Sequence, residues 1–308
     1  SDRVPVVCWA VGDGERSLTD ANQKTGYTAV ADLLVKNNFS HKDVLLSQLP
    51  AVPADCDELA IINPTSALTD QTVKIVTAYL AGGGRLLVAA EPWPHDPKTT
   101  VTLSSILRPY GQGFSGALVI ETDPSRAAVQ DPTNPAVVTY GQSPITKDVQ
   151  GIVSFFPQAT AITGAPAAGV RAVRIATTTS GSYAIAAERS SLARQSQDTS
   201  GPFTIMETLE QAAGSGKTRI VVAGTAAFAQ TGTLPPNNND ANLELALGSF
   251  QWLAGQDSLI ALPPKPDRAL PIALTQQDQS VLIFITAFLM PGLTVFGGIM
   301  VWWRRRIF

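Results

Sequence analysis

The 308-residue chain is poor in charge, in histidine and in cysteine. Charged residues make up 15% of it, against about a quarter in an average globular protein, and lysine and arginine are scattered until the last few positions. A nucleic-acid-binding domain carries a basic stripe, so nucleic acid is not expected as a partner. Two histidines and two cysteines leave little material for a metal cage or a disulfide framework, and we expect no cofactor and no bound metal.

The beginning of the chain lacks the features of a targeting segment, but its end carries a long apolar run. Residues 281–303 hold no charged side chain over 23 positions, and as a helix they would span roughly 34 Å, enough for a hydrocarbon core of about 30 Å. Aromatic and basic residues typical of a cytoplasmic membrane boundary close the run: Trp302, Trp303, Arg304, Arg305 and Arg306. We therefore predict a transmembrane helix with a basic cytoplasmic tail over 304–308.

This pattern predicts a bacterial inner-membrane protein whose residues before about 280 lie outside the cytoplasm. Residues 263–280 are expected to be a proline-rich linker. In the middle of the span, Pro291 and Gly292 predict a kink, because proline removes a backbone donor and clashes with the preceding turn. The kink can be a packing surface for another membrane subunit or a bend in a simple anchor.

Residues 1–262 have the pattern of an α/β domain. Short apolar runs occur at 4–11, 58–63, 85–90 and 218–224, and they are typical of strands buried on both faces. Residues 43–47 are a further strand candidate. Helical spacing of apolar residues occurs at 27–36, in the segment that follows Thr69, and at 242–253. This alternation predicts a parallel sheet covered by helices. Residues 115–190 contain strand candidates without a strong helix, and predict a β-rich, antiparallel insertion.

The loop after the first predicted strand reads VGDGERSLTD, and it raises the question of a ligand site. Ligands of parallel α/β sheets bind beyond the carboxyl ends of the strands, where this loop and the loop 91–97 both belong. Acidic residues and one histidine from the two loops could converge there as metal ligands or as an acid and a base: Asp13, Glu15, Glu91, His95 and Asp96. An acidic, solvated rim is the plainer interpretation. Gly12 and Gly14 are expected to permit the tight exit from the strand.

Other catalytic patterns are incomplete. The segment GSGKT at 214–218 lacks the glycine that a phosphate-binding loop needs at position 211, and it precedes a strand rather than following one. No G-x-S-x-G nucleophile elbow is present. Cys8 lies within the first strand and is expected to be a buried core residue. Cys56 precedes its own strand, so we expect it to lie beyond the ~7 Å limit for a disulfide with Cys8.

Four segments together resemble one family, the auxiliary (GldG-like) subunit of gliding-motility-type ABC transporters. They are AVGDGERSLTD with GYTAVADLL, DELAIINPTSALTDQTVKIVTAYLAGGGRLLVAAEP, RIVVAGTAAFAQTG with NLELALGSFQWLAGQDSLIAL, and the C-terminal run. Their order and spacing cover perhaps two thirds of the chain. The chain departs from the family at Asp13 and Ser143, where histidine is common, and it lacks the family's N-terminal membrane helix and further extracytoplasmic segment.

The resemblance implies a flavodoxin-like or amidotransferase-like α/β layer without catalytic residues. Its partners would be an ABC permease, a cytoplasmic ATPase and, if another chain supplies the missing N-terminal half, a second accessory subunit. The loop of Gly12, Asp13, Gly14, Glu15 and Arg16 then becomes a candidate contact with a partner or ligand. Two alternatives stay open: an anchored domain that binds a glycan or peptide, and a metal-dependent hydrolase.

Overall fold

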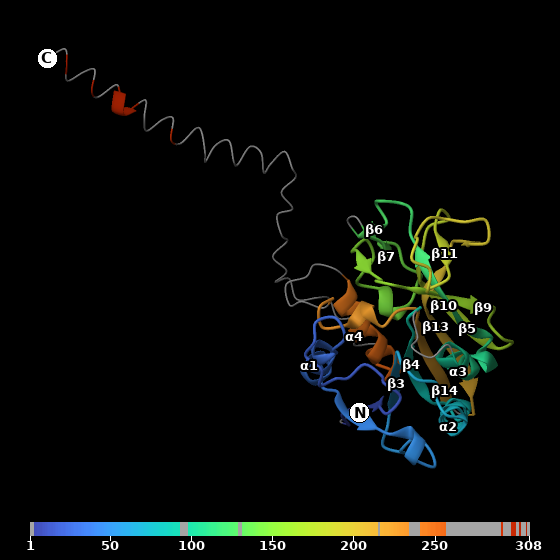
Figure 1. The fold of residues 1–308 in the computed structure, drawn as a ribbon. Helices are drawn as coiled ribbons and strands as arrows, with labels where there is room; N and C mark the ends of the chain where they lie inside the picture. The colour runs from blue at the N-terminus through green and yellow to red at the C-terminus, as the bar shows by residue number, and fades with distance from the viewer. Residues whose placement is uncertain are drawn as a thin grey trace. The chain divides into compact units, whose positions relative to one another are not determined.

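The computed structural model describes residues 3–92, 98–128, 131–214, 216–233 and 241–256, together with residues 291, 297–299, 302 and 306. The chain divides into two units, Ser1–Pro264 and Lys265–Phe308. Figure 1 traces the chain through both units in order of sequence.

The described residues of the second unit are helical. They include Pro291, and the guanidinium of Arg306 lies over the Trp302 ring, 4.6 Å from its centroid. Four residues of the predicted anchor lie outside the described part: Gly292, Trp303, Arg304 and Arg305. Within the part of the chain that the structure describes, no helix is long and apolar enough to cross a membrane. Most of residues 281–303 lies outside that part, so the membrane span stays a prediction.

The first unit is built on one large mixed sheet, and half of this sheet is parallel. The parallel strands, in spatial order, are β2 (Ser40–Val44), β1 (Val6–Ala10), β3 (Glu58–Ile62), β4 (Arg85–Ala89) and β14 (Gly216–Ala223). The strands β3 and β4 are joined by a helix that crosses over the sheet, as parallel strands require. The predicted parallel arrangement is confirmed.

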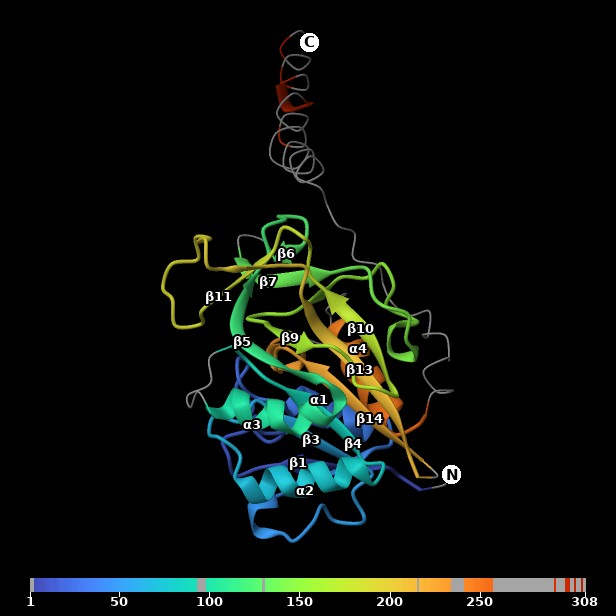
Figure 2. The ribbon, with the colours of Figure 1, turned by 90° about the vertical axis from the view of Figure 1, so that its right-hand side faces the viewer.

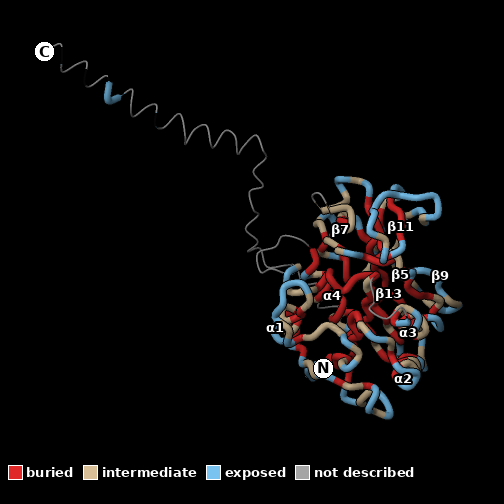
Figure 3. The backbone as a smooth tube through the Cα atoms, in the orientation of Figure 1, coloured by how far each residue is buried: buried red, intermediate tan, exposed pale blue. Residues whose placement is uncertain are grey.

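The inner parallel strands contribute side chains to two apolar layers, because successive side chains point to opposite faces. In β1, Val7 and Trp9 belong to one core cluster, whereas Cys8 and Ala10 belong to the other. Helices α1 (Thr28–Lys36) and α4 (Asn242–Leu253) cover the first face. Helices α2 (Asp70–Ala81) and α3 (Lys98–Leu107) cover the second face and lie in front of the sheet in Figure 2. The result is a three-layer α/β/α half in which β1, β3 and β4 are buried. Figure 3 shows buried backbone, in red, in the interior and exposed backbone on the outside.

The rest of the large sheet is antiparallel, and β13 (Thr204–Ala213) joins it to β14 through a hairpin. The other strands of this half are β5 (Gln112–Ile120), β9 (Thr160–Gly164), β10 (Val170–Thr177), β11 (Tyr183–Ile185) and β12 (Thr199–Ser200). A small second sheet contains β6 (Ala127–Ala128), β7 (Asp131–Val137) and β8 (Ser154–Phe155). Four single-turn helices complete the described elements: η1 (Leu46–Gln48), η2 (Arg108–Tyr110), η3 (Pro144–Thr146) and η4 (Ala227–Ala229).

Some predicted boundaries were wrong, and several elements were missed. Strand β2 begins at Ser40 rather than at 43. It is an edge strand with polar first residues, so the sequence contains no apolar run that marks its start. Helix α3 and strand β13 were not predicted. The sequence of α3 is rich in threonine and serine, and packing of Leu103 and Ile106 against the sheet overrides that weak propensity. The GSGKT segment lies in the β13–β14 hairpin and enters strand β14, as predicted.

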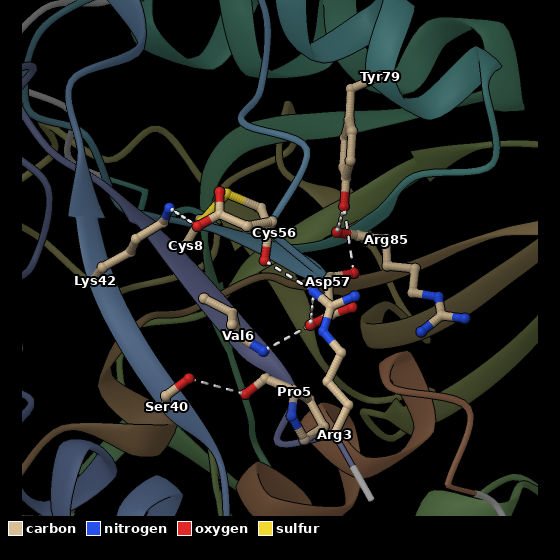
Figure 4. Close-up of a disulfide and its surroundings, with 11 residues drawn as sticks. Arg3, Pro5, Val6, Cys8, Ser40, Lys42, Cys56, Asp57, Tyr79 and Arg85 are labelled. Atoms are coloured by element: carbon tan, nitrogen blue, oxygen red, sulfur yellow. Dashed lines mark hydrogen bonds and ion pairs between the residues drawn. A yellow bond between two sulfur atoms is a disulfide. The ribbon is translucent and has the colours of Figure 1, made fainter. Parts of the chain in front are cut away.

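The expectation that Cys8 and Cys56 are too far apart was wrong. The two form a disulfide with a Cα–Cα distance of 5.5 Å (Figure 4). A straight extension of β3 would place Cys56 opposite Pro5, about 10 Å along the strand from Cys8. The chain turns instead, and the amide of Cys56 donates to the carbonyl of Pro53. This turn brings Cys56 back over β1, and a sequence pattern of strands does not contain that information.

Candidate functional site

The loops that follow β1, β3 and β4 meet at the carboxyl edge of the parallel sheet. The backbone of Gly12 has a φ of 116°, and that of Gly14 has a φ of 80°. A Cβ atom on Gly14 would lie only 1.9 Å from Oγ1 of Thr65, so this loop approaches the next one too closely for any other residue. The carbonyl of Asp13 accepts hydrogen bonds from the amides of Thr65 and Ser66, both at 2.9 Å.

An ion pair ties these loops together. Nη2 of Arg16 lies 2.8 Å from both carboxylate oxygens of Glu91, and Nδ2 of Asn63 donates to Oε2 of Glu91 at 2.9 Å. The backbone amide of Glu91 donates to Oδ1 of Asn63, and the indole of Trp9 donates to the carbonyl of Arg16. The side chains of Arg16 and Glu91 are only 18% and 12% exposed. We call Arg16, Asn63 and Glu91 the edge clamp; its polar atoms bind one another and hold the loops in place.

Asp13 and Glu15 lie beside the edge clamp and are half-buried. Burial raises the pKa of the Asp13 carboxyl, and it also raises that of Glu15, where the nearby Asp13 charge adds a smaller increase. Oε2 of Glu15 accepts a hydrogen bond from the amide of Asp13 at 2.8 Å. Among the described ion pairs, none involves either carboxylate. Unlike Glu91, neither carboxylate is paired with a cation among the described residues.

The structure therefore brings part of the predicted acidic set to one edge. His95 and Asp96 lie outside the described residues. Glu91 is occupied by Arg16 and Asn63, which leaves it poorly suited to act as a base or a metal ligand. Within the described ranges, no group of three or more histidine, cysteine, aspartate or glutamate side chains could hold a metal ion. Ser143 caps η3, and its hydroxyl oxygen accepts a hydrogen bond from the amide of Ile145.

A second candidate site lies in the antiparallel half, where the strands separate. Strand β13 pairs with β10 and β14 along its length, but with β9 only at Thr204. A cavity of about 490 Å³ lies between the β5–β9 pair and the β10–β13 pair, and we call it the strand-junction cavity. This volume is within the range of small-molecule sites. Its polar lining includes Gln112, Ser115, Thr163, Arg174, Thr204 and Glu207.

Glu207 distinguishes this cavity from an ordinary packing defect. The residue is only 3% exposed, and its Oε1 atom is buried with no hydrogen-bond partner among the described residues. Burial raises the pKa of Glu207 to about 7, and the charge of Arg174 offsets part of that rise. Glu207 could not be placed from the sequence because β13 was not predicted, and without β13 the cross-strand position of Arg174 could not be recognised. A charged residue inside the run TIMETLEQAA was the available signal.

The fold and the site together define a mixed α/β domain whose described residues present no assembled catalytic cluster. A family model described as "ABC-type uncharacterized transport system" matches residues 4–240. The chain belongs to this family of ABC-type transport auxiliary proteins, and its role is an accessory one in such transport. The family match supports an auxiliary subunit of an ABC transporter, as the sequence motifs predicted; the narrower gliding-motility type stays a prediction.

Solved structures show the fold but not the function. The mmIFT52 N-terminal domain is 14% identical with a TM-score of 0.58, over 80% of this chain and 96% of that one. At this identity the likeness concerns the fold alone. A putative ThuA-like protein from Parabacteroides merdae is 10% identical with a TM-score of 0.41, over 82% of this chain and 90% of that one. A comparison with curated protein sequences finds no significant match.

Proposed function

We propose that this chain is a non-catalytic, membrane-anchored accessory subunit of an ABC transporter complex. It would link the permease and the cytoplasmic ATPase to a process in the cell envelope. The observation that carries the proposal is the family match over residues 4–240, which covers most of the first unit. The uncharged run at 281–303 and the arginines that follow it supply the anchor in this proposal.

The disulfide supports the proposed location of the first unit outside the cytoplasm. Disulfides persist in oxidising compartments such as the bacterial periplasm and are rare in the cytosol, where thiols are kept reduced. Cys8 and Cys56 are the only cysteines of the sequence, and they are bonded to each other. This agrees with the orientation that the C-terminal arginines predict.

The carboxyl edge of the parallel sheet is the proposed contact surface for a protein partner. The edge clamp fixes the positions of three loops, so the acidic pair Asp13 and Glu15 is presented on a rigid support. A rigid loop loses little conformational freedom when a partner binds, which favours affinity. The complementary surface on the partner would carry lysine or arginine.

Co-purification from membranes tests the accessory role. The full chain, tagged and produced with its own permease and ATPase, should retain both partners in mild detergent. The double variant Asp13→Lys and Glu15→Lys should lose most of the permease, whereas Asp32→Lys, an exposed change on α1, should retain it. If neither partner accompanies the wild-type chain, the proposal fails.

Topology is tested separately. Alkaline phosphatase joined before residue 4 should be active, and the same enzyme joined after residue 308 should be inactive, because it folds only outside the cytoplasm. The opposite pattern would overturn the proposed orientation without affecting the accessory role.

A further inference from the structure

The strand-junction cavity contains a buried hydrogen-bond acceptor to which none of the described residues donates. A carboxylate oxygen without a hydrogen-bond donor is a destabilising feature when it is removed from water. Oε1 of Glu207 is in this situation, and Glu207 lines the cavity rather than the closed core. A group of this kind is expected where a ligand supplies the missing donor.

The guanidinium group of Arg174 is on the residue opposite Glu207, but the two side chains form no described ion pair. Arg174 on β10 and Glu207 on β13 are direct cross-strand partners, and both line the cavity. Opposed residues in an antiparallel pair have Cβ atoms about 4.5–5.5 Å apart, close enough for a salt bridge. Among the ion pairs of the described residues, none joins these two side chains. A shift in register follows Arg174, and it changes the local course of β10.

The remaining lining is uncharged in the described part of the chain. Hydroxyl groups and one buried amide contribute adaptable hydrogen bonds: Ser115, Thr163, Thr177, Thr199, Thr204 and Gln112. Phe203 and Ile162 supply apolar surface. The cavity is therefore a mixed site with one negative and one positive group, separated from each other and partly surrounded by apolar atoms.

We propose that the strand-junction cavity binds a small zwitterion of the amino-acid or dipeptide class, whose ammonium group contacts Glu207 and whose carboxylate contacts Arg174. The proposal goes beyond the accessory role and does not depend on it. An anion alone would meet the carboxylate of Glu207, and a cation alone would leave Arg174 without a partner. A neutral polyol could donate to Glu207 but would pair with neither charge. The apolar residues and the volume of about 490 Å³ accommodate a short side chain.

Calorimetric titration of the full chain in detergent at pH 8 tests this proposal. The probes are L-alanine, L-alanyl-L-alanine, N-acetyl-L-alanine, L-alaninamide and D-glucose. L-alanine or L-alanyl-L-alanine should bind, and the two alanine derivatives, each of which lacks one charge, should bind at least tenfold more weakly. D-glucose should bind more weakly still.

Matched variants locate the site. Glu207→Gln and Arg174→Gln should each weaken binding of the better zwitterion at least tenfold. The controls Glu210→Gln and Arg171→Gln lie three residues away on the same two strands, outside the lining, and should stay within twofold of wild type. Circular dichroism of each variant distinguishes loss of binding from loss of folding, and Arg174→Lys, which keeps the charge, should recover part of the affinity.

A pH series adds a readout that a purely structural role would not produce. Affinity for the zwitterion should fall as the pH is lowered from 8 to 5, because protonation of Glu207 removes the partner of the ammonium group. Arg174 is the other charged group of the described lining, and Val222 of β14 is the residue opposite Glu207 on its other side. Equal binding of N-acetyl-L-alanine, preference for D-glucose, unchanged binding by Glu207→Gln, or no binding of any probe at 10 mM would each overturn the proposal.

Discussion

Two glutamates show how differently the two halves of the large sheet treat a carboxylate. Glu91, at the edge of the parallel half, accepts hydrogen bonds from Arg16 and Asn63 at distances of 2.8 and 2.9 Å. Glu207, in the antiparallel half, lies opposite Arg174, but one of its buried oxygens has no hydrogen-bond partner among the described residues. A carboxylate with its hydrogen bonds made holds loops together, whereas a buried carboxylate oxygen without a donor beside a cavity has room for a donor from another molecule. The difference favours a structural and contact role for the parallel edge and a ligand site at the strand junction.

Glu58 is a third buried glutamate, and it differs from Glu207 because it does not line a described cavity. It lies in β3, is fully buried, and has two carboxylate oxygens without hydrogen-bond partners among the described residues. Burial raises the pKa of Glu58 well above its usual value, and Arg85 offsets only part of the rise. Glu58 is not among the residues that line the three described cavities, so we interpret it as a neutral core residue.

Loss of the disulfide should have the largest effect, and it acts on the parallel half. The bond spans a separation of 48 residues, for which loop-closure entropy predicts a contribution of roughly 4 kcal/mol. Cys8→Ala with Cys56→Ala should lower the free energy of unfolding by about this amount in guanidinium titrations. Wild-type protein in a reducing agent should behave in the same way. Equal stability of the reduced and oxidised chains would show that the bond has no stabilising role.

The next effect concerns Glu207 and depends on pH. Its pKa of about 7 in the folded chain exceeds the ordinary value of 4.5, so the folded state binds the extra proton between these values. Stability from this group is fully present below pH 4.5 and is lost as pH rises through about 7, a change of about 3 kcal/mol.

Chemical unfolding at pH 5 and pH 8 measures this difference. Glu207→Gln should show a smaller loss of stability between the two pH values than wild type does. Glu58→Gln should reduce the loss further, since the raised pKa of Glu58 acts with the same sign. Parallel pH profiles for wild type and Glu207→Gln would contradict the assignment.

Removal of the neighbouring arginine should affect stability differently at Glu91 and at Glu207. Arg16→Ala leaves the mostly buried Glu91 without its cation and should lower the free energy of unfolding by about 2 kcal/mol. Arg174→Ala at pH 5.5 should lower it by less than about 0.5 kcal/mol, because this exposed side chain forms no described ion pair. Thermal melts of both variants suffice, and equal losses would remove the contrast between the two halves.

The smallest effect is expected in the hairpin that carries GSGKT. Lys217 forms an ion pair with Glu210 at 2.8 Å, but its side chain is 57% exposed. Lys217→Ala should change stability by less than about 0.5 kcal/mol. Addition of MgATP should not shift the melting temperature of wild type or variant, because Gly216, Lys217 and Thr218 are paired with β13 as part of strand β14. An ATP-dependent shift that the variant loses would restore the phosphate-loop interpretation.

The sequence predicted the parallel half well, because its signals are local. β1 is an uninterrupted apolar run, and β3 and β4 are apolar after one charged first residue. The side-chain oxygen of Thr69 accepts a hydrogen bond from the amide of Thr72 at the start of α2. Helix α4 was predicted with its observed boundaries, 242–253. The first-strand loop was placed at the correct edge for the same reason, since the carboxyl ends of parallel strands share one side.

What the sequence by itself determined is the order of buried strands and helices, the positions of the tight glycine turns and the family. Tertiary structure alone decided the pairing of Arg16 with Glu91, 75 residues apart, and of Cys8 with Cys56. It alone placed Glu207 opposite Arg174 beside a cavity. Apolar periodicity is a property of neighbouring residues, whereas ion pairs, disulfides and cavities depend on turns and strand registers that bring distant residues together.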